Sequence, residues 1–476
     1  MESNFFYYKW FRKTVSFLTD LLLYAIPFLS LYVLTSFLSG MIRIAAFVLL
    51  VIFYFLIIRF FKDKIYQLLS AFYKKCETMD RKTMIIILSL VMIIGKIIAT
   101  VFFSFDSTGN GDIGIYNEIA ERIYTTGNIH SSAISHLFGI ALHFVVFKYM
   151  HLPLHVGMFI AFFIGTIVNF ISFSDLMGKE KTFMILLVYT LMPSSFVISF
   201  CLTHELFVYM YLSLFLLCFV RFLRSAAISK TLAYLLGMIV FTVLTCFVNP
   251  VGYIIYVIFV LSVLFSNADL RKKAMIIAAL LASLCLSNVI SGALEVNEYN
   301  TTVNTYTILI HGSNPESLGE QVDGYPEDQM RDYLRKYDLS FKPVHFLEGY
   351  RAVLLEQYAY LLTHPATLLR LVAHKLYILW SGVHYPLELA HFYDAMPMGL
   401  YLLLLAINAL IYLFVITAGN VFAKKQDDGI DQTNYKLTLL GIFGVTMLSV
   451  VLNKYSIYAT AFLYYIVFMN VRFTDD

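Results

Sequence analysis

The feature that most constrains this chain is a series of apolar runs, each roughly 18 residues or longer, along its 476 positions. A helix of that length crosses a hydrocarbon core of about 30 Å. Only 14% of the residues are charged and 60% are hydrophobic, whereas a soluble domain carries roughly 25% charged residues. The sequence therefore predicts an all-α polytopic membrane protein.

Basic residues orient these runs, because Lys and Arg gather in cytoplasmic loops. The basic clusters at 59–82, 179–181, 221–230, 271–273 and 424–425 all fall on the cytoplasmic side if twelve spans lie between two cytoplasmic termini. The expected spans are 14–37, 41–61, 83–104, 153–176, 182–200, 205–223, 231–249, 250–267, 274–293, 397–418, 436–453 and 455–472.

Two long connections remain on the outer side, 105–152 and 294–396. The first contains an apolar segment, 131–150, that we expect to lie as an amphipathic helix at the outer interface; a thirteenth span is the alternative. The second opens with turn-forming residues and continues with helical periodicity, which predicts a small, mainly helical extracytoplasmic domain. Four units are expected: an N-terminal hairpin with a basic cytoplasmic loop (1–82), a transmembrane module (83–293), the outer domain (294–396) and C-terminal helices (397–476).

The segment "GDIGIYNEIAERIYTTGNIH", residues 111–130, predicts a short amphipathic helix. Asp112, Tyr116 and Ala120 follow one another at four-residue steps and share one helical face. Asp112 stands at the helix start, where the helix dipole favours its ionised form; a plain N-cap explains the same carboxylate equally well. A neighbouring apolar stripe is expected to rest on the outer membrane surface, namely Ile115, Ile119 and Ile123.

A second acidic candidate is Glu205, which follows His204 where one apolar run ends and the next begins. A carboxylate this close to hydrocarbon is costly, and such groups are usually paired or functional. A short interfacial turn is the alternative interpretation. Two carboxylates on one side of the membrane suit a glycosyl transfer site, because one can take a proton from an acceptor hydroxyl and the other can orient groups or hold a cation.

A phosphate group would need positive charge on the same side. The outer cations include Lys148, Arg351, Arg370, Lys375 and Lys454. Arg370 and Lys375 share a helix with His374 that leads to Trp380. Basic residues and Trp also anchor any interfacial helix, and a snorkelling Lys454 is equally ordinary.

Four stretches together resemble the GT-C-type membrane glycosyltransferases, especially bacterial relatives of the protein O-mannosyltransferase and aminoarabinose transferase families. "GDIGIYNEIAERIYTTGNI" resembles the first outer loop of that family. "LMPSSFVISFCLTHELF" is similar to a Pro-Ser followed by an acidic residue that opens a later span. "HGSNPESLGE" with "HPATLLRLVAHKLYILWSG" resembles the long outer loop, and "LNKYSIYATAFLYYI" resembles the closing span.

The resemblance implies a sugar donor linked to polyprenyl phosphate and attack by a hydroxyl of a cell-surface glycan on the outer face. Asp112 would be the catalytic base and Glu205 the second acidic residue. Ile113 replaces the usual acidic neighbour of that Asp, so Asp106 is an alternative base, and whether a divalent metal is needed stays open. The residues expected to bind the donor and its phosphate are Lys454, Lys375, Arg370, His204 and Tyr116.

Two other function classes remain open. A polysaccharide polymerase or ligase would place its chemistry on Arg and His residues of 294–396, such as Arg351. A lipid-linked-sugar transporter or flippase is the other alternative, although transporters place polar residues at mid-membrane and often have pseudo-symmetric halves, and here the charges cluster at span ends. We expect a multi-pass protein of a bacterial plasma membrane, an extracytoplasmic active site, lipid-linked sugar and glycan as partners, and no nucleic acid.

Overall fold

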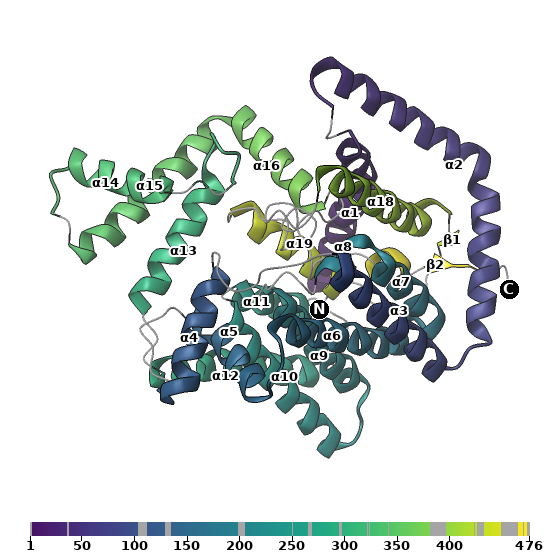
Figure 1. Cartoon of the computed structure of the whole chain (residues 1–476), viewed down its shortest axis with the longest axis horizontal. Coiled ribbons are helices and arrows are strands. Elements are labelled where there is room, and N and C mark those ends of the chain that lie inside the picture. Colours follow the sequence, from purple (N-terminus) through teal and green to yellow (C-terminus); the bar gives the residue numbers. More distant parts are fainter. Residues whose placement is uncertain are drawn as a thin grey trace.

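The structure is a computed structural model of the whole chain (Figure 1). It describes residues 2–35, 38–102, 112–128, 135–198, 205–249, 251–264, 269–294, 298–320, 322, 324–340, 342–380, 397–422, 424–425, 433–448, 465–469 and 471–473. Nearly all of these residues are helical. The remaining regular structure is a short antiparallel pair between β1 (Lys424–Lys425) and β2 (Val471–Arg472).

The described helices follow the apolar runs of the sequence. In chain order they are α1 (Glu2–Val33), α2 (Gly40–Glu77), α3 (Arg81–Phe102), α4 (Asp112–Thr126), α5 (Ser135–Tyr149), α6 (Leu154–Met177), α7 (Lys179–Leu191), α8 (Pro193–Ile198), α9 (Glu205–Arg224), α10 (Ile228–Val248), α11 (Val251–Leu264), α12 (Leu270–Ala293), α13 (Glu298–Ser313), α14 (Tyr325–Lys336), α15 (Pro343–Thr363), α16 (Pro365–Trp380), α18 (Met398–Thr417), the π-helical η1 (Ala418–Phe422) and α19 (Thr433–Leu448).

Eight helices of the described chain are long and apolar enough to cross a membrane, so the protein is a multi-pass, all-α membrane protein. They are α1, α2, α3, α6, α9, α10, α12 and α18 with η1. Three further expected spans are shorter or broken. The run 182–200 divides into α7 and α8 at Pro193, because the residue before a proline is pushed out of the helical conformation. The runs 250–267 and 436–453 give α11 and α19, of 14 and 16 residues. Most of 455–472 lies outside the described residues.

The centre of the bundle is formed by α9, which packs against α6 on one side and against α10 on another. Close approach of α6 and α9 depends on Gly165, because a Cβ at this position would lie 2.6 Å from the ring of Tyr209. Both helices bury aromatic side chains in the contact, and the rings of Phe162 and Tyr209 stack with centroids 6.0 Å apart.

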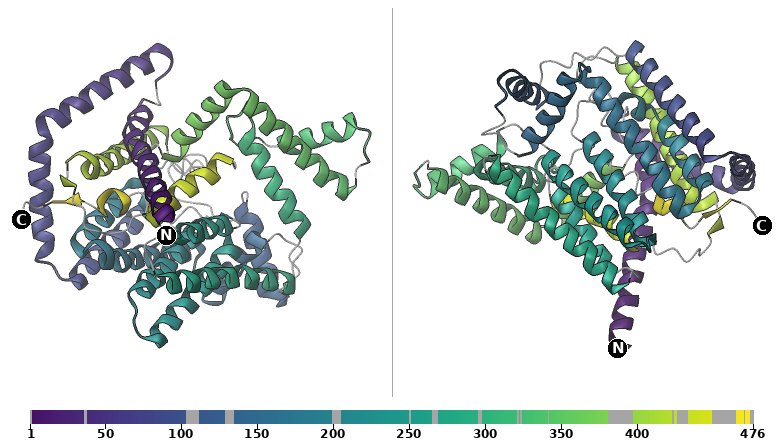
Figure 2. Two further views of the ribbon diagram at one scale, coloured as in Figure 1. Left: turned by 180° about the vertical axis from the view of Figure 1, so that it is seen from behind. Right: turned by 90° about the horizontal axis from the view of Figure 1, so that it is seen from below.

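The first hairpin packs on the C-terminal helices rather than standing apart from them. Helix α1 contacts α18 and α19, and α2 contacts η1 and α7. Lys436 on α19 donates a 2.7 Å hydrogen bond to Ser16 and lies 3.9 Å from the carboxylate of Asp20, both on α1. Helices from the beginning of the chain and from its last quarter therefore lie side by side. In Figure 2 the two views from behind and below show α1 beside the yellow C-terminal segments.

Charged groups from several helices meet at one end of the bundle. Asp175 at the end of α6 lies 3.1 Å from Arg81 and 3.9 Å from Arg221. Lys179 donates to the carbonyl of Met79, and Lys272 donates to the carbonyl of Leu223 at 2.6 Å. These residues fall at the ends of spans that we expected to be cytoplasmic, and the fold brings them together.

Helices α13, α14 and α15 enclose a hydrophobic core of their own, separate from that of the spans. Figure 1 shows this group with α16 in green, beside the spans. Helix α14 is strongly amphipathic: its charged residues face outward, whereas Met330 and Leu334 are buried. The region 294–396 is therefore mainly helical where it is described, as its periodicity predicted.

Helix α5 is the segment that we expected at the outer interface. It has 15 residues, which gives a length of about 22 Å, shorter than the hydrocarbon core. It packs on α4 and α10 and buries Ile140, Ala141 and Phe144 among protein side chains.

Candidate functional site

Polar side chains gather around α16 and at the turn that precedes α14. In this turn Glu316 donates its backbone N–H to Oδ1 of Asn314 at 2.9 Å, and Gly319 donates to the carbonyl of Asn314 at 3.1 Å. Gly319 adopts a positive φ of 86°, which glycine reaches without a steric penalty. The Gly, Asn and Pro residues of 312–326 thus form the turn that their composition predicted.

The turn is fastened to α16 by one polar contact and one steric contact. Glu320 Oε1 lies 2.6 Å from Nε2 of His374. Gly319 passes directly over the side chain of Lys375, so that a Cβ at Gly319 would collide with Cε of that lysine. His374 and Lys375 are consecutive on the helix. The turn therefore pairs with His374 through Glu320 and covers Lys375 with Gly319.

Lys375 is completely buried beneath this turn. Burial removes water from the ammonium group, which disfavours its charged form and lowers the pKa of Lys375 to about 7. We had expected Lys375 to contact a donor phosphate. Its cover by the turn and its lowered pKa do not favour that role, because a phosphate ligand must be exposed and charged.

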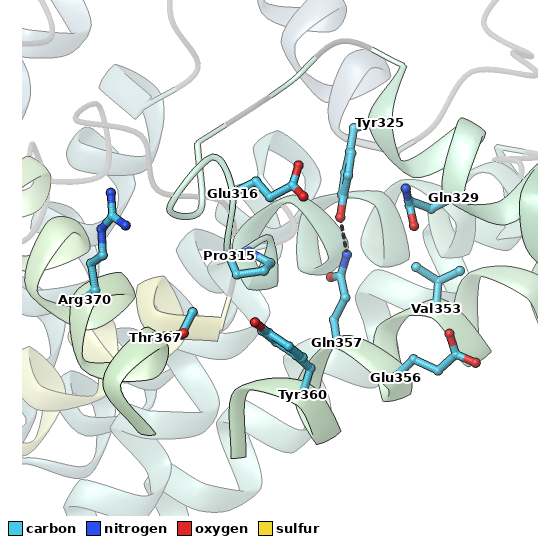
Figure 3. A pocket seen from close by; sticks show the side chains of 10 residues that line it. All are labelled: Pro315, Glu316, Tyr325, Gln329, Val353, Glu356, Gln357, Tyr360, Thr367 and Arg370. Carbon is cyan, nitrogen blue, oxygen red and sulfur yellow. Dashed lines mark hydrogen bonds between the residues drawn. The ribbon is translucent and has the colours of Figure 1, made fainter. Parts of the chain in front are cut away.

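A pocket of about 640 Å³ opens between α14, α15 and α16, and we call it the polar pocket (Figure 3). Gln357 stands at its centre, donating to the Tyr325 hydroxyl at 2.8 Å and accepting from the Ser313 hydroxyl at 2.5 Å. Burial raises the pKa of Tyr325, and the Gln357 contact partly offsets this effect. The lining residues are Pro315, Glu316, Tyr325, Gln329, Val353, Glu356, Gln357, Tyr360, Thr367 and Arg370.

A second pocket, of about 450 Å³, lies on the other side of Arg370, and we call it the corner pocket. It is lined by Tyr32, Arg43, Leu318, Arg370, Ala373, His374 and Tyr377. The guanidinium of Arg43 lies 4.1 Å from the ring centroid of Tyr32, and that ring packs edge-on against Tyr377 at 5.4 Å. The corner between α1 and α2 therefore faces α16, which is more than three hundred residues away in the sequence. Within the described part of the chain, no carboxylate forms an ion pair with Arg43 or Arg370.

The expected base lies on a helix whose packing differs from our prediction. Helix α4 begins at Asp112, whose side chain lies outside the described residues. Tyr116 is buried and its ring packs edge-on against Phe144 of α5 at 6.3 Å. Tyr116 therefore packs in the protein core, and the structure does not place it in a donor site. The predicted isoleucine stripe is also wrong as a membrane face, since Ile119 and Ile123 are buried against the protein and only Ile115 is exposed.

Glu205 is the first residue of α9 and is completely buried. Two cations that we expected on the outer side have ordinary surroundings: Lys148 pairs with Glu121 at 2.6 Å, and Arg351 is exposed on α15. Three expected site residues fall outside the described residues, namely Asp106, His204 and Lys454.

The described residues contain no candidate metal site, because no three His, Cys, Asp or Glu side chains lie close enough together to bind a metal ion. Apart from Arg370 and His374, the residues that line the two pockets were missed by sequence reasoning. Arg43 carried a usable signal, since it is a charge one turn into an apolar helix and such charges are often functional. Tyr325 and Gln357 carried none, because polar residues in a polar region are ordinary.

Comparison of the chain with protein-family models, with curated proteins and with solved structures gave no match.

Proposed function

We propose that this protein is a membrane glycosyltransferase of the GT-C type, which moves a sugar from a polyprenyl-phosphate donor to a hydroxyl of a cell-surface glycan. The proposal places it in a bacterial plasma membrane with its active site on the outer face. Its multi-pass helical architecture supports this proposal, because a lipid-linked donor reaches such a protein from within the bilayer.

The observation that carries the proposal is the polar pocket. In a chain with only 14% charged residues, this pocket gathers two carboxylates, two side-chain amides, two tyrosines and one guanidinium. Amides and carboxylates bind sugar hydroxyls through hydrogen bonds, and tyrosine rings offer apolar faces to the C–H groups of a sugar. Binding sites commonly combine such a surface with a few convergent polar groups. A saccharide acceptor fits this chemistry better than a purely apolar ligand does.

The residues have distinct roles in the proposed reaction. Asp112 removes the proton of the acceptor hydroxyl while the oxygen of that hydroxyl attacks the anomeric carbon of the donor sugar. The bond from that carbon to the phosphate oxygen breaks, and the phosphate leaves with the electron pair, so the anomeric centre inverts. Arg370, at the edge of the polar pocket, neutralises the departing phosphate. Glu205 is the second acidic residue of the site and orients the reacting groups from its buried position.

The experiment that tests this function is a transfer assay with purified protein, a radiolabelled polyprenyl-phosphate sugar and membrane glycan from the host. The wild type is expected to release polyprenyl phosphate and label the glycan, whereas Asp112→Asn and Arg370→Ala are not. Arg335→Ala is the matched control, because Arg335 is exposed and pairs only with Asp332 in the described contacts. The proposal is refuted if the folded wild type transfers none of several donor sugars.

A polysaccharide ligase is a second candidate, and one contact favours it. His374 and Glu320 form a carboxylate–imidazole pair at 2.6 Å on the rim of the corner pocket. A carboxylate that orients a histidine is a common arrangement for a general base. Two mutations distinguish the two candidate functions. A ligase is expected to lose activity with His374→Gln and to keep its activity with Asp112→Asn. The transferase is expected to lose activity with Asp112→Asn.

A further inference from the structure

The corner pocket adjoins an apolar groove between the two helices of the first hairpin. This groove has a volume of about 720 Å³, and we call it the α1–α2 groove. Its wall is almost purely apolar and includes Leu34, Leu38, Leu49, Leu50, Phe53 and Leu56. The helices that form it are long and apolar enough to cross a membrane, which suits a groove that is exposed to lipid.

The groove and the corner pocket share the same turn of chain. Tyr32 lines the corner pocket, and its carbonyl accepts a 2.7 Å hydrogen bond from the hydroxyl of Thr35, which lines the groove. On α2, Arg43 lines the corner pocket and Ala46 lines the groove. Residues three apart lie on the same face of a helix. A single ligand can therefore extend from one cavity into the other.

The corner pocket offers positive charge to such a ligand. Arg43 and Arg370 come from opposite walls, α2 and α16. The Nε of Arg43 is buried and has no hydrogen-bond partner among the described residues, and a buried donor without an acceptor costs free energy. His374 is in contact with the carboxylate of Glu320, and Lys375 is covered by the turn. The two guanidinium groups therefore set the charge of the pocket.

We propose that the corner pocket and the α1–α2 groove together bind a lipid phosphate, with the phosphate between Arg43 and Arg370 and the alkyl chain in the groove. A guanidinium group can donate two parallel hydrogen bonds to two oxygens of one phosphate. The groove binds the alkyl chain through van der Waals contacts and the two charges bind the phosphate, so both parts of the ligand contribute to the affinity. Its identity as the polyprenyl-phosphate sugar carrier rests on the proposed function.

The experiment measures binding of a polyprenyl monophosphate to full-length protein in detergent by native mass spectrometry. Arg43→Ala and Arg370→Ala are each expected to weaken binding about ten-fold, a change of about 1.4 kcal/mol. Ala46→Trp, which fills the groove and keeps both arginines, is expected to weaken it similarly. The control is Arg59→Ala, because Arg59 is exposed on the same helix and lines neither cavity. Thermal unfolding of each variant verifies that it is folded.

Three further probes separate the sources of affinity. A polyprenol of the same length lacks the phosphate and shows how much affinity the phosphate supplies. Inorganic phosphate lacks the alkyl chain and shows how much affinity that chain supplies. Phosphatidylglycerol shows whether any anionic membrane lipid suffices. The proposal is overturned if folded Arg43→Ala and Arg370→Ala bind like the wild type, or if polyprenol or phosphatidylglycerol binds equally well. Asp112→Asn is expected to bind the lipid normally. If the wild type binds the lipid phosphate but transfers no sugar, the lipid site stands and the transferase function falls.

Discussion

Glu320 Oε1 lies 2.6 Å from His374 Nε2, and this contact joins the turn before α14 to the face of α16. The same turn supplies Leu318 to the corner pocket and Glu316 to the polar pocket. Both pockets therefore depend on how this turn sits on the helix. Its two ends are anchored differently, since one rests on hydrogen bonds to Asn314 and the other on the contact with His374.

Replacing Gly319 with alanine is expected to destabilise the protein by roughly 1–3 kcal/mol. The residue has a positive φ, and the added methyl group would collide with Lys375 and lie 3.1 Å from the carbonyl of Gly312. Gly324→Ala is the matched control, because its φ is also positive at 74° but its nearest neighbour, Asp328 Oδ2, is 3.9 Å away. Thermal unfolding in detergent measures both. Equal losses for the two variants would show that the collision contributes nothing.

The buried Lys375 predicts a stability that rises with pH. Its pKa is about 7 in the folded protein and about 10.4 in an unfolded chain. Between these values the unfolded state holds a proton that the folded state lacks, so the free energy of unfolding increases with pH by up to roughly 1.4 kcal/mol per unit and levels off above the upper value.

Lys375→Met is expected to remove this dependence and to raise the melting temperature most at pH 7 and below. Thermal unfolding between pH 6 and pH 10 provides the measurement. Lys336→Met serves as the control, because Lys336 is exposed on α14. Identical pH profiles for the wild type and Lys375→Met would mean that the amine reaches solvent.

Asp175→Asn is expected to cost about 1 kcal/mol of stability. Asp175 lies between Arg81 and Arg221, and its neutralisation leaves two neighbouring guanidinium groups to repel each other. Asp332→Asn is the comparison, since it breaks a fully exposed pair within α14 and is expected to cost almost nothing. Chemical denaturation at low and high salt distinguishes them. A cost that does not shrink with added salt would contradict an electrostatic origin.

Asp112→Asn is expected to lower the rate of sugar transfer about 10²–10⁴-fold, because the amide cannot accept the proton of the acceptor hydroxyl. The loss should appear in kcat, with little change in KM for the lipid donor. Steady-state kinetics with the purified protein measure both values. Asp332→Asn is again the control. A tenfold rise in KM at unchanged kcat would instead make Asp112 a binding residue.

Local sequence patterns predicted the helices well where hydrophobicity alone determines the position of a span. The cores of α3, α6, α9, α10 and α12 lie within runs that were recognised as spans. The misjudged elements depend on local breaks or on neighbours. Pro193 divides one expected span, and Ile119 and Ile123 of α4 turn inward because α5 offers them a protein surface. Amphipathicity does not say whether an apolar stripe meets lipid or another helix.

The candidate site was predictable only in part. Arg370 was recognised from its helix, and the structure places it between two pockets. Arg43 could not be linked to it, because their meeting requires the first hairpin to fold back onto α16. Burial of Lys375 was also hidden, since it depends on the path of a turn over fifty residues earlier in the chain.

Helix α2 has 38 residues, a length of about 57 Å along its axis, nearly twice the thickness of the hydrocarbon core. Its most apolar stretch has no buried residue. Figures 1 and 2 show that α2 bends sharply partway along, so its two arms cannot both stand upright in the bilayer. Since its basic residues are concentrated toward the C-terminal half, that half is suited to the anionic headgroup layer. Membrane thickness would then set the tilt of the first arm, and with it the angle at which Arg43 meets α16.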